Sequence, residues 1–566
     1  MGNAEKMLLN YSGSTALSFL CDLTSLSIDQ VNFITCQVVA LCFSLSMKRW
    51  IKDPHTKLIY TLICGLGICL FCFGNQIFHI ISSAGLGYTL IKTNKSSNMP
   101  WIVLGANMFY LSSLHLQRQF FDELGSYSLD ITGPLMVLTQ KVTSLAFSLQ
   151  DAIDQKKSDD YKGTEMQKKY AVLEAPSFLE YWSFVFQFQS MLAGPLVLFK
   201  DFREFIHTDE FPSPLHAVVK KMGVSVFFAV VFIKVTPVYS IDKLKEFEFL
   251  WDTTFLYRMF YVTIATMMER AKYYHAWILA DAVCNASGLG YDKQSQTWDL
   301  VTNVDALGFE LGLNLKESLD SWNKGTMKWL RHVVYERVNP SIRTVATYAM
   351  SAIWHGFYPG YYITFLSGSV FTSVARQVRK TIRPLFVNDR GLKLVYDFFT
   401  WLTTRFVVAY VTFSFIILDF TPSIVLYLRL FCCFHVAAFG AMFALPKLSK
   451  HLKNRGTQPQ PAARVPEAQK QAQKDTTERV KDNAQDVAEV TKPIKKENEQ
   501  PPAARKNKGE DDSYYGPKAA TKELISHEFP EIKSYLSNSK PTNDVWTTWT
   551  MNNAAMNGTP VQLKTG

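Results

Sequence analysis

One stretch of the chain, residues 344 to 375, is strongly apolar and contains no Asp, Glu, Lys or Arg in 32 consecutive positions. Such a run is typical of a helix that crosses a lipid bilayer, because about 20 apolar residues span the hydrocarbon. His355 lies inside this run. An ionisable side chain is costly at membrane depth, so it indicates a functional group that faces the protein interior or a watery cavity. The alternative is a structural histidine that is hydrogen-bonded to a neighbouring carbonyl.

The chain divides by composition into two parts. Residues 447 to 566 contain 20 Lys plus Arg, 15 Asp plus Glu and few large apolar side chains. That composition cannot offset the entropy lost on ordering, so we expect a disordered, cytosolic tail. Residues 1 to 446 hold most of the apolar residues, and we expect them to form a multi-span membrane domain. The net charge of +10 is not gathered in a basic stripe with interleaved aromatics, so nucleic acid is not an expected partner.

Apolar stretches of span length predict an all-α polytopic membrane fold with roughly nine to eleven transmembrane helices. Two weaker segments are amphipathic: 129–150 fits a helix in the interface or packed against others, and 318–338 fits a helix at the membrane surface. No repeat is visible, which disfavours the duplicated halves of many transporters. Several of the predicted spans are long enough to be either two segments or one tilted helix. The predicted spans are 31–48, 58–83, 100–117, 181–199, 217–238, 254–285, 344–372, 395–420 and 423–445.

Familiar catalytic signatures are absent from the sequence. There is no GxSxG, HExxH or Walker A pattern, and no histidine is followed by Asp five positions later. Cys69 and Cys72 form a CxxC pair without a second pair of ligands, so we expect no metal site.

Two polar residues remain near the membrane, Asn323 and, 32 positions later, His355. Each sits in an aromatic motif: Trp322-Asn323, Thr326, Trp329-Leu330 and Tyr335 in the first, Trp354-His355-Gly356 and Tyr358-Pro359-Gly360-Tyr361-Tyr362 in the second. Together these motifs resemble the membrane-bound O-acyltransferase family, and the second resembles its lysophospholipid acyltransferase branch. Further similar segments cover most of 100–445, including Asp130 to Met136, Gln140-Lys141 and 270–290. The family's usual His-Asp-Gly is replaced here by Gln150-Asp151-Ala152.

A histidine and an asparagine are suited to catalyse acyl transfer from a thioester to an alcohol. A histidine in a poorly hydrated cavity stays neutral and can act as the general base, a role worth about two to four powers of ten in rate. The resemblance implies that Asn323 is the second catalytic residue. Its amide either stabilises the oxyanion or orients the alcohol. Because the thiolate of coenzyme A is a stable leaving group, no metal, cofactor or covalent intermediate is required.

Both substrates would need their own contacts. Lys324, Lys328 and Arg331 are candidates for a cationic mouth that binds coenzyme A, and the alternative is ordinary snorkelling at the interface. For the aromatic candidates the alternative is packing, and Asp281 and Arg270 could instead pair with each other or with neighbours. The remaining candidates for substrate contact are Trp322, Thr326, Trp354, Tyr358, Tyr361, Tyr362 and Asp281.

The function that these observations favour is transfer of a fatty acyl group from acyl-coenzyme A to the free hydroxyl of a lysophospholipid, in the endoplasmic reticulum membrane that the resemblance implies. The expected partners are the bilayer, acyl-coenzyme A and a lysophospholipid. One alternative is a same-fold enzyme that acylates a protein, a sterol or diacylglycerol. A second is a transporter or scaffold in which His355 relays protons or only packs. The sequence leaves the headgroup, the acyl-chain preference and the oligomeric state open.

Overall fold

The structure is a computed structural model that describes residues 11–24, 26–121, 130–157, 161–208 and 210–456. Its regular elements are helices throughout, and no strand is formed in these residues. This confirms the predicted all-α fold. The last helix, α21 (Cys433–Gly456), continues ten residues beyond the boundary expected at 446, and the rest of the predicted tail lies outside the described residues.

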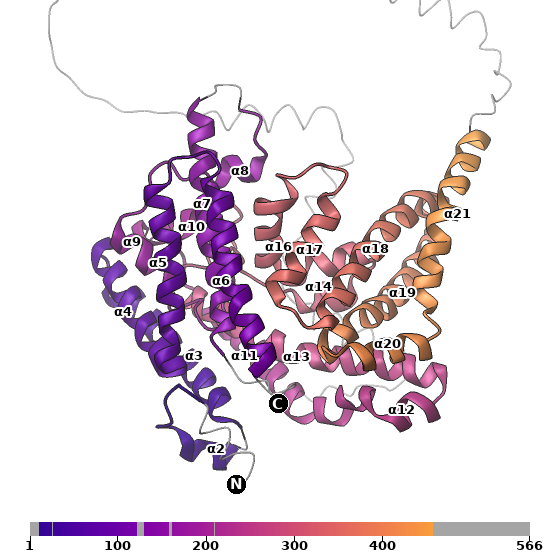
Figure 1. Ribbon diagram of the computed structural model, residues 1–566, viewed down its shortest axis with the longest axis horizontal. Helices are drawn as coiled ribbons and strands as arrows, with labels where there is room; N and C mark the ends of the chain where they lie inside the picture. Colours follow the sequence, from indigo (N-terminus) through magenta and orange to yellow (C-terminus); the bar gives the residue numbers. More distant parts are fainter. Residues whose placement is uncertain (1–10, 25, 122–129, 158–160, 209, 457–566) are drawn as a thin grey trace, which may run out of the picture. The chain divides into compact units, whose positions relative to one another are not determined.

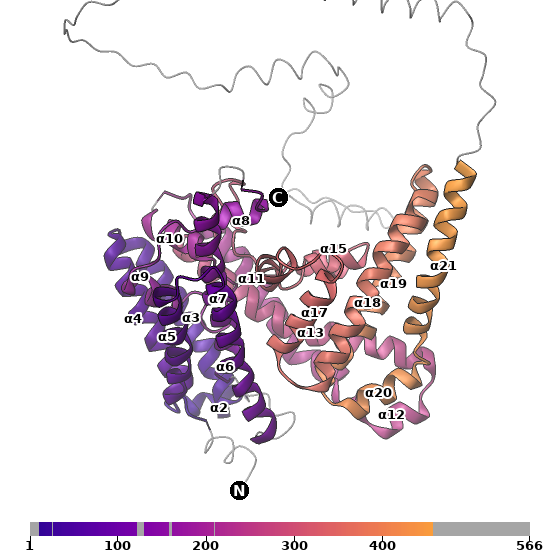
Figure 2. The same cartoon turned by 45° about the horizontal axis from the view of Figure 1, so that its top comes forward.

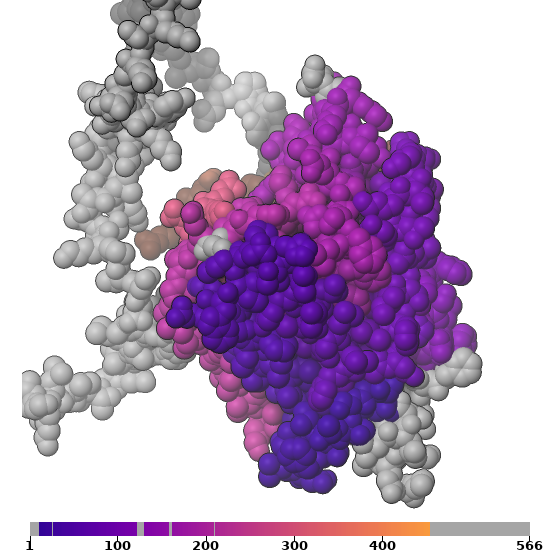
Figure 3. Space-filling model, turned by 90° about the vertical axis from the view of Figure 1, so that its left-hand side faces the viewer, coloured from indigo at the N-terminus to yellow at the C-terminus, as the bar shows by residue number. Residues whose placement is uncertain are grey.

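The first helices form one packed group (Figures 1 and 2). Their sequence order is α2 (Ser18–Thr24), α3 (Ile28–Trp50), α4 (Pro54–Phe73), α5 (Ile77–Thr93), α6 (Met99–Phe121), α7 (Thr132–Lys157), α8 (Glu165–Tyr170), α9 (Phe178–Val185) and α10 (Phe199–His207). The indigo and violet N-terminal helices dominate the face seen in Figure 3. Exposed side chains of this group include Ile63, Leu70, Phe78 and Phe109, as expected for a surface that contacts lipid.

The span predicted at 58–83 is divided into two helices by local chemistry. The Asp53 carboxylate accepts a hydrogen bond from the Thr56 amide, and Pro54 occupies the first helical position, so α4 begins there. Gly74 ends α4 with φ +53°, and a Cβ at this position would meet the Ser12 carbonyl oxygen. A short 3-10 turn, Gly74–Gln76, then leads into α5.

The centre of the N-terminal group is α7. Every residue from Leu138 to Ala152 is buried, so the amphipathic segment predicted at 129–150 is a core helix packed against others. Its charged side chains are paired inside the protein: the Lys141 ammonium donates to the Phe184 carbonyl at 2.9 Å. The Asp151 carboxylate accepts two hydrogen bonds from Arg337, at 3.0 and 2.7 Å. Asp151, which stands where the sequence departs from the family's His-Asp-Gly, is therefore part of α7 and forms a structural ion pair.

A second group links the N-terminal helices to the C-terminal ones. It contains α11 (Leu215–Lys234), the 3-10 turns Thr236–Tyr239 and Asp242–Lys245, α12 (Phe247–Asp252) and the long helix α13 (Phe255–Ser287). Helix α13 packs on α3, on α11 and on α19 (Arg390–Ile417). Helix α13 therefore contacts both the N-terminal and the C-terminal group of helices.

The C-terminal group contains the segments that carry Asn323 and His355. Its elements are α14 (Ala306–Leu311), α15 (Leu315–Asp320), α16 (Lys324–Leu330), a π-helical turn (Arg331–Tyr335), α17 (Arg343–His355), α18 (Pro359–Ile382), a 3-10 turn (Arg383–Leu385), α19, α20 (Phe420–Arg429) and α21. The single helix predicted at 318–338 is wrong, because Ser321 to Asn323 interrupt it. The long apolar stretch predicted at 344–372 forms two segments, because Gly356 ends α17 and Pro359 begins α18.

Four helical segments of the described chain are long and apolar enough to cross a bilayer: Ile28–Trp50, Pro54–Thr93, Leu215–Lys234 and Arg390–Ile417. The bent pair of α20 and α21, with 70° between its members, is a fifth candidate. This number is smaller than the nine to eleven spans predicted. Helices α6, α7, α13 and α18 have the length of a span but carry buried polar side chains. The span predicted at 181–199 includes only the end of the short helix α9 and the first residue of α10.

Candidate active site

The three groups of helices enclose a cavity of about 2120 Å³. His355 and Asn323 both line it, together with eight of the ten residues that the sequence indicated for substrate contact. Those eight are Trp322, Lys324, Thr326, Lys328, Arg331, Trp354, Tyr358 and Tyr361. The fold therefore gathers the two aromatic motifs around one chamber.

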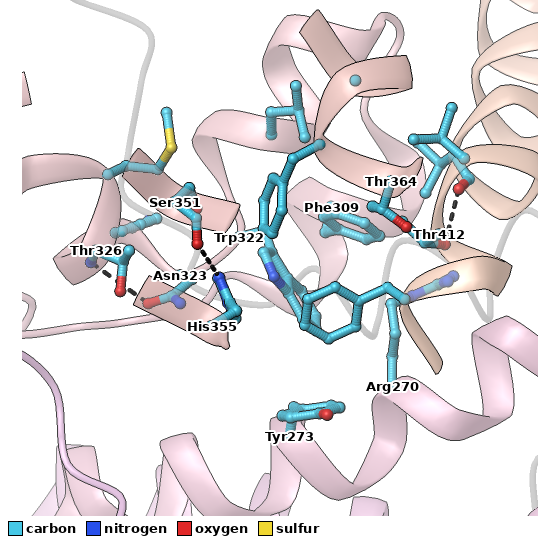
Figure 4. Close-up of a pocket in the computed structure, with 18 of the residues that line it drawn as sticks. Arg270, Tyr273, Phe309, Trp322, Asn323, Thr326, Ser351, His355, Thr364 and Thr412 are labelled. Carbon is cyan, nitrogen blue, oxygen red and sulfur yellow. Dashed lines mark hydrogen bonds between the residues drawn. The ribbon is translucent and has the colours of Figure 1, made fainter. Parts of the chain in front are cut away.

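His355 is the last residue of α17, and a helical hydrogen bond fixes which of its ring nitrogens is protonated. The Nδ1 atom lies 2.7 Å from the Ser351 carbonyl oxygen (Figure 4). A carbonyl oxygen only accepts hydrogen bonds, so Nδ1 carries the hydrogen and donates it. In the neutral imidazole the lone pair is then on Nε2, the atom required for a general base.

The imidazole of His355 is surrounded by aromatic rings. Ring centroids lie 4.6 Å away for Trp354, 4.9 Å for Phe365, 5.2 Å for Phe415 and 5.7 Å for Tyr361. These apolar walls exclude much of the water that would stabilise a positive charge on the ring. The surroundings therefore favour the uncharged imidazole.

Asn323 stands at the start of α16 with φ 44° and ψ 53°, a left-handed conformation that asparagine adopts more readily than most residues. Its Oδ1 atom caps the helix by accepting a hydrogen bond from the Thr326 amide at 3.4 Å. Since the oxygen is committed to the cap, the Nδ2 group is the part of the side chain that remains for a ligand. The arrangement therefore presents a hydrogen-bond donor, as an oxyanion requires.

Two side chains from elsewhere hold this turn in place. Asn303 accepts hydrogen bonds from the Lys324 and Gly325 amides, at 2.8 and 2.9 Å, through its backbone and side-chain oxygens. The buried Gln140 of α7 donates from Nε2 to the Thr326 hydroxyl at 2.8 Å. The loop that carries Asn323 is thus tied to a core helix.

The same helix also supports the segment that carries His355. The Trp354 indole N–H donates to the Met136 carbonyl at 3.1 Å, and Met136 precedes Gln140 by one helical turn. The Trp354 ring further packs on Trp329 of α16, with centroids 5.7 Å apart. His355 and Asn323 both line the cavity, and Figure 4 shows both side chains among the residues that surround it.

The cationic candidates lie along one part of the cavity wall. Lys328 donates to the Tyr170 hydroxyl at 2.7 Å and lies 3.6 Å from Asp201, so much of its bonding capacity is used within the protein. Burial lowers the pKa of the Lys328 ammonium and raises the pKa of the Asp201 carboxyl, although their mutual attraction opposes both shifts. Arg331 is largely exposed and pairs with Glu336 at 2.7 Å. Five further lining cations were not candidates in the sequence: Arg118, Lys272, Lys316, Arg376 and Arg379.

Asp281 and Tyr362 do not line the cavity. The Asp281 carboxylate is almost fully buried and accepts hydrogen bonds from Lys221 at 2.7 Å and from the Thr302 hydroxyl at 2.8 Å. This ion pair joins α11 to α13, so the substrate contact expected of Asp281 is corrected to a structural role. Arg270 pairs with Glu310 at 2.8 Å and not with Asp281.

Other residues at the site were missed because nothing in their local sequence marks them. His115 of α6 and Asn303 both line the cavity. Gln140 lay in a segment similar to the family, but its partner could not be read from spacing. Among the described residues, no group of three His, Cys, Asp or Glu side chains is arranged to hold a metal ion.

The all-helical fold surrounds a chamber lined by His355 and Asn323, as expected for a membrane acyltransferase, and the comparisons with known proteins identify the family. Residues 116–413 match the model of the membrane-bound O-acyltransferase family. The chain belongs to this family, which makes it an O-acyltransferase.

Several relatives cover most of the chain. "Lysophospholipid acyltransferase 6" of Drosophila melanogaster is 42% identical over 77% of this chain, and the alignment spans 64% of the fly protein, which is therefore considerably longer. "Membrane-bound glycerophospholipid O-acyltransferase 2" of Gallus gallus is 36% identical over 78% of this chain and 89% of its own length. "Lysophospholipid acyltransferase" of Schizosaccharomyces pombe is 30% identical over 72% and 84%, respectively.

Proposed function

We propose that this protein transfers a fatty acyl group from acyl-coenzyme A to the free hydroxyl of a lysophospholipid. The relatives' names support the acceptor class. The observation that carries the chemistry is the hydrogen bond from His355 Nδ1 to the Ser351 carbonyl, because it leaves the Nε2 lone pair for the acceptor's hydroxyl. The cavity is large enough for an acyl chain and a lipid together, and its lining is mostly apolar.

In this mechanism the hydroxyl oxygen of the lysophospholipid attacks the thioester carbonyl carbon while His355 Nε2 accepts the hydroxyl proton. The Asn323 Nδ2 group donates a hydrogen bond to the oxyanion of the tetrahedral intermediate. When the intermediate collapses, the C–S bond breaks and the coenzyme A thiolate takes the proton from His355. The products are a phospholipid and free coenzyme A, and no metal or cofactor takes part.

The cations of the cavity wall suit the phosphates of coenzyme A. Lys324, Arg331 and Arg379 lie on this wall, and their charge would attract the polar end of the donor. We further propose that the protein acts in the endoplasmic reticulum membrane, where lysophospholipids reach it laterally.

The experiment that tests this function is an acceptor panel. Purified protein in lipid nanodiscs is given labelled acyl-coenzyme A together with a lysophospholipid, a diacylglycerol, a sterol or a peptide. We expect ester formation only on lysophospholipids, and loss of the reaction in His355→Ala. A matched control is His79→Ala, since His79 hydrogen-bonds Tyr110 and does not line the cavity. Transfer to another acceptor, or full activity of His355→Ala, would contradict the proposal.

A further inference from the structure

His115 lies beside the catalytic turn and belongs to a helix far from it in sequence. In α6 the residues Val103, Asn107, Leu111 and His115 are spaced four apart and form one buried stripe. The stripe ends at His115, whose side chain is 8% exposed and lines the cavity. The residue just precedes the segment that matches the family model, 116–413.

The His115 ring satisfies a carbonyl at the end of α17. Its Nε2 atom lies 3.2 Å from the Trp354 carbonyl oxygen, which can only accept a hydrogen bond. His115 therefore carries its hydrogen on Nε2 and donates it. The last carbonyls of a helix have no partner within the helix, so this bond replaces one that α17 cannot make for itself.

The same ring also limits the space for a side chain at residue 356, which follows His355 in the sequence. Gly356 has φ +119°, a conformation that residues with a side chain rarely adopt. A Cβ built on Gly356 would lie 3.3 Å from the Cγ and Nδ1 atoms of His115. The His115 ring thus bonds to residue 354 and packs against residue 356, the two neighbours of the base.

We propose that His115 is a positioning residue for His355: from α6 it holds the Trp354-His355-Gly356 turn so that the Nε2 atom of His355 points at the reacting hydroxyl. This role rests on the proposed acyl transfer. The bond from the Trp354 indole to Met136 holds the side-chain end of the turn, and His115 holds its backbone. Because a shift of about 1 Å at a reacting atom can cost about a hundredfold in rate, loss of this support lowers the chemical step more than it lowers substrate binding.

Two amide variants separate this role from general packing. In His115→Gln the amide nitrogen reaches the place of Nε2 and can still donate to Trp354, whereas in His115→Asn it reaches only the place of Nδ1. We expect His115→Asn and His115→Leu to lower kcat about ten- to a hundredfold, while KM for acyl-coenzyme A stays within about twofold of wild type. His115→Gln should recover most of the lost kcat. His79→Leu, on α5 of the same helical group, should have the wild-type rate.

Kinetics and the melting temperature in detergent decide the outcome. A wild-type kcat in His115→Asn, or equal losses in the Asn and Gln variants together with lowered melting temperatures, would overturn the positioning role. If the wild-type protein transfers the acyl group and His355→Ala does not, the proposed function stands even when the positioning role of His115 fails. The failure of one proposal is therefore distinguishable from the failure of the other. If the wild-type protein forms no ester, both proposals fall.

Discussion

Ser351 and His355 lie one helical turn apart in α17, and the carbonyl of the first fixes the tautomer of the second through a 2.7 Å hydrogen bond. His355→Ala removes the base while the helix remains. We therefore expect kcat to fall by about two to four powers of ten, with KM for acyl-coenzyme A nearly unchanged. Steady-state kinetics with labelled acyl-coenzyme A check this, and an unchanged kcat would assign the proton transfer to another group.

Asn323 has separate tasks for its two side-chain atoms, and one substitution separates them. Asn323→Asp keeps an oxygen that can cap α16 at the Thr326 amide and replaces the Nδ2 donor by an acceptor. We expect kcat to fall by about two to three powers of ten while the melting temperature stays near that of wild type. Comparison with Asn323→Ala, which also loses the cap, tests the assignment. A catalytically active Asp variant would show that the donor is not needed.

Gln140 and Thr326 should act as one unit, because the hydrogen bond from Gln140 Nε2 to Thr326 Oγ1 is lost when either side chain is removed. We expect Gln140→Leu and Thr326→Val each to lower kcat by about tenfold, since each loosens the turn at Asn323. The double variant should be little worse than either single variant. Fully additive losses in a double-mutant cycle would mean that the two side chains act independently.

Gly356 is expected to tolerate no side chain. Gly356→Ala places a Cβ against the His115 ring at a residue with φ +119°, so it should destabilise the turn by about 1 to 3 kcal/mol and lower kcat. The matched control is Gly67→Ala in α4, where a Cβ meets nothing within 4 Å and helix propensity favours alanine. Melting temperature and kcat of the two variants are compared directly. Equal behaviour would remove the steric argument.

Asp281 is expected to affect stability and not substrate binding. Without Asp281, Lys221 keeps only the exposed Asp299, at 3.4 Å, as an acidic partner, so Asp281→Ala should cost up to about 3 kcal/mol of stability. The double variant Asp281→Ala/Lys221→Met should recover part of that loss. Thermal unfolding in detergent measures both effects. A raised KM in Asp281→Ala without a change in melting temperature would return this residue to the substrate site.

Local sequence patterns predicted much of the fold and part of the site. The uncharged run around His355 and the aromatic motif at Asn323 identified both candidate catalytic residues, and the cavity contains both. Helix boundaries were less predictable, because apolar runs continue through the breaks at Gly74 and Gly356. A hydropathy average over many residues does not reveal that a single glycine with positive φ ends a helix.

The partners of the two candidate catalytic segments depended on contacts that no local pattern encodes. Gln140 meets Thr326 across 186 positions, and His115 meets Trp354 across 239. The sequence alone predicted an all-helical membrane protein, since composition and periodicity fix the solvent and the helix faces, and the resemblance of its motifs to the family implied the pair of His355 and Asn323. Only the tertiary structure decided which distant side chains support the turns at Asn323 and His355, and that Asp281 pairs with Lys221 away from the cavity. Those properties arise from the packing of distant helices, whose meeting is set by the whole fold.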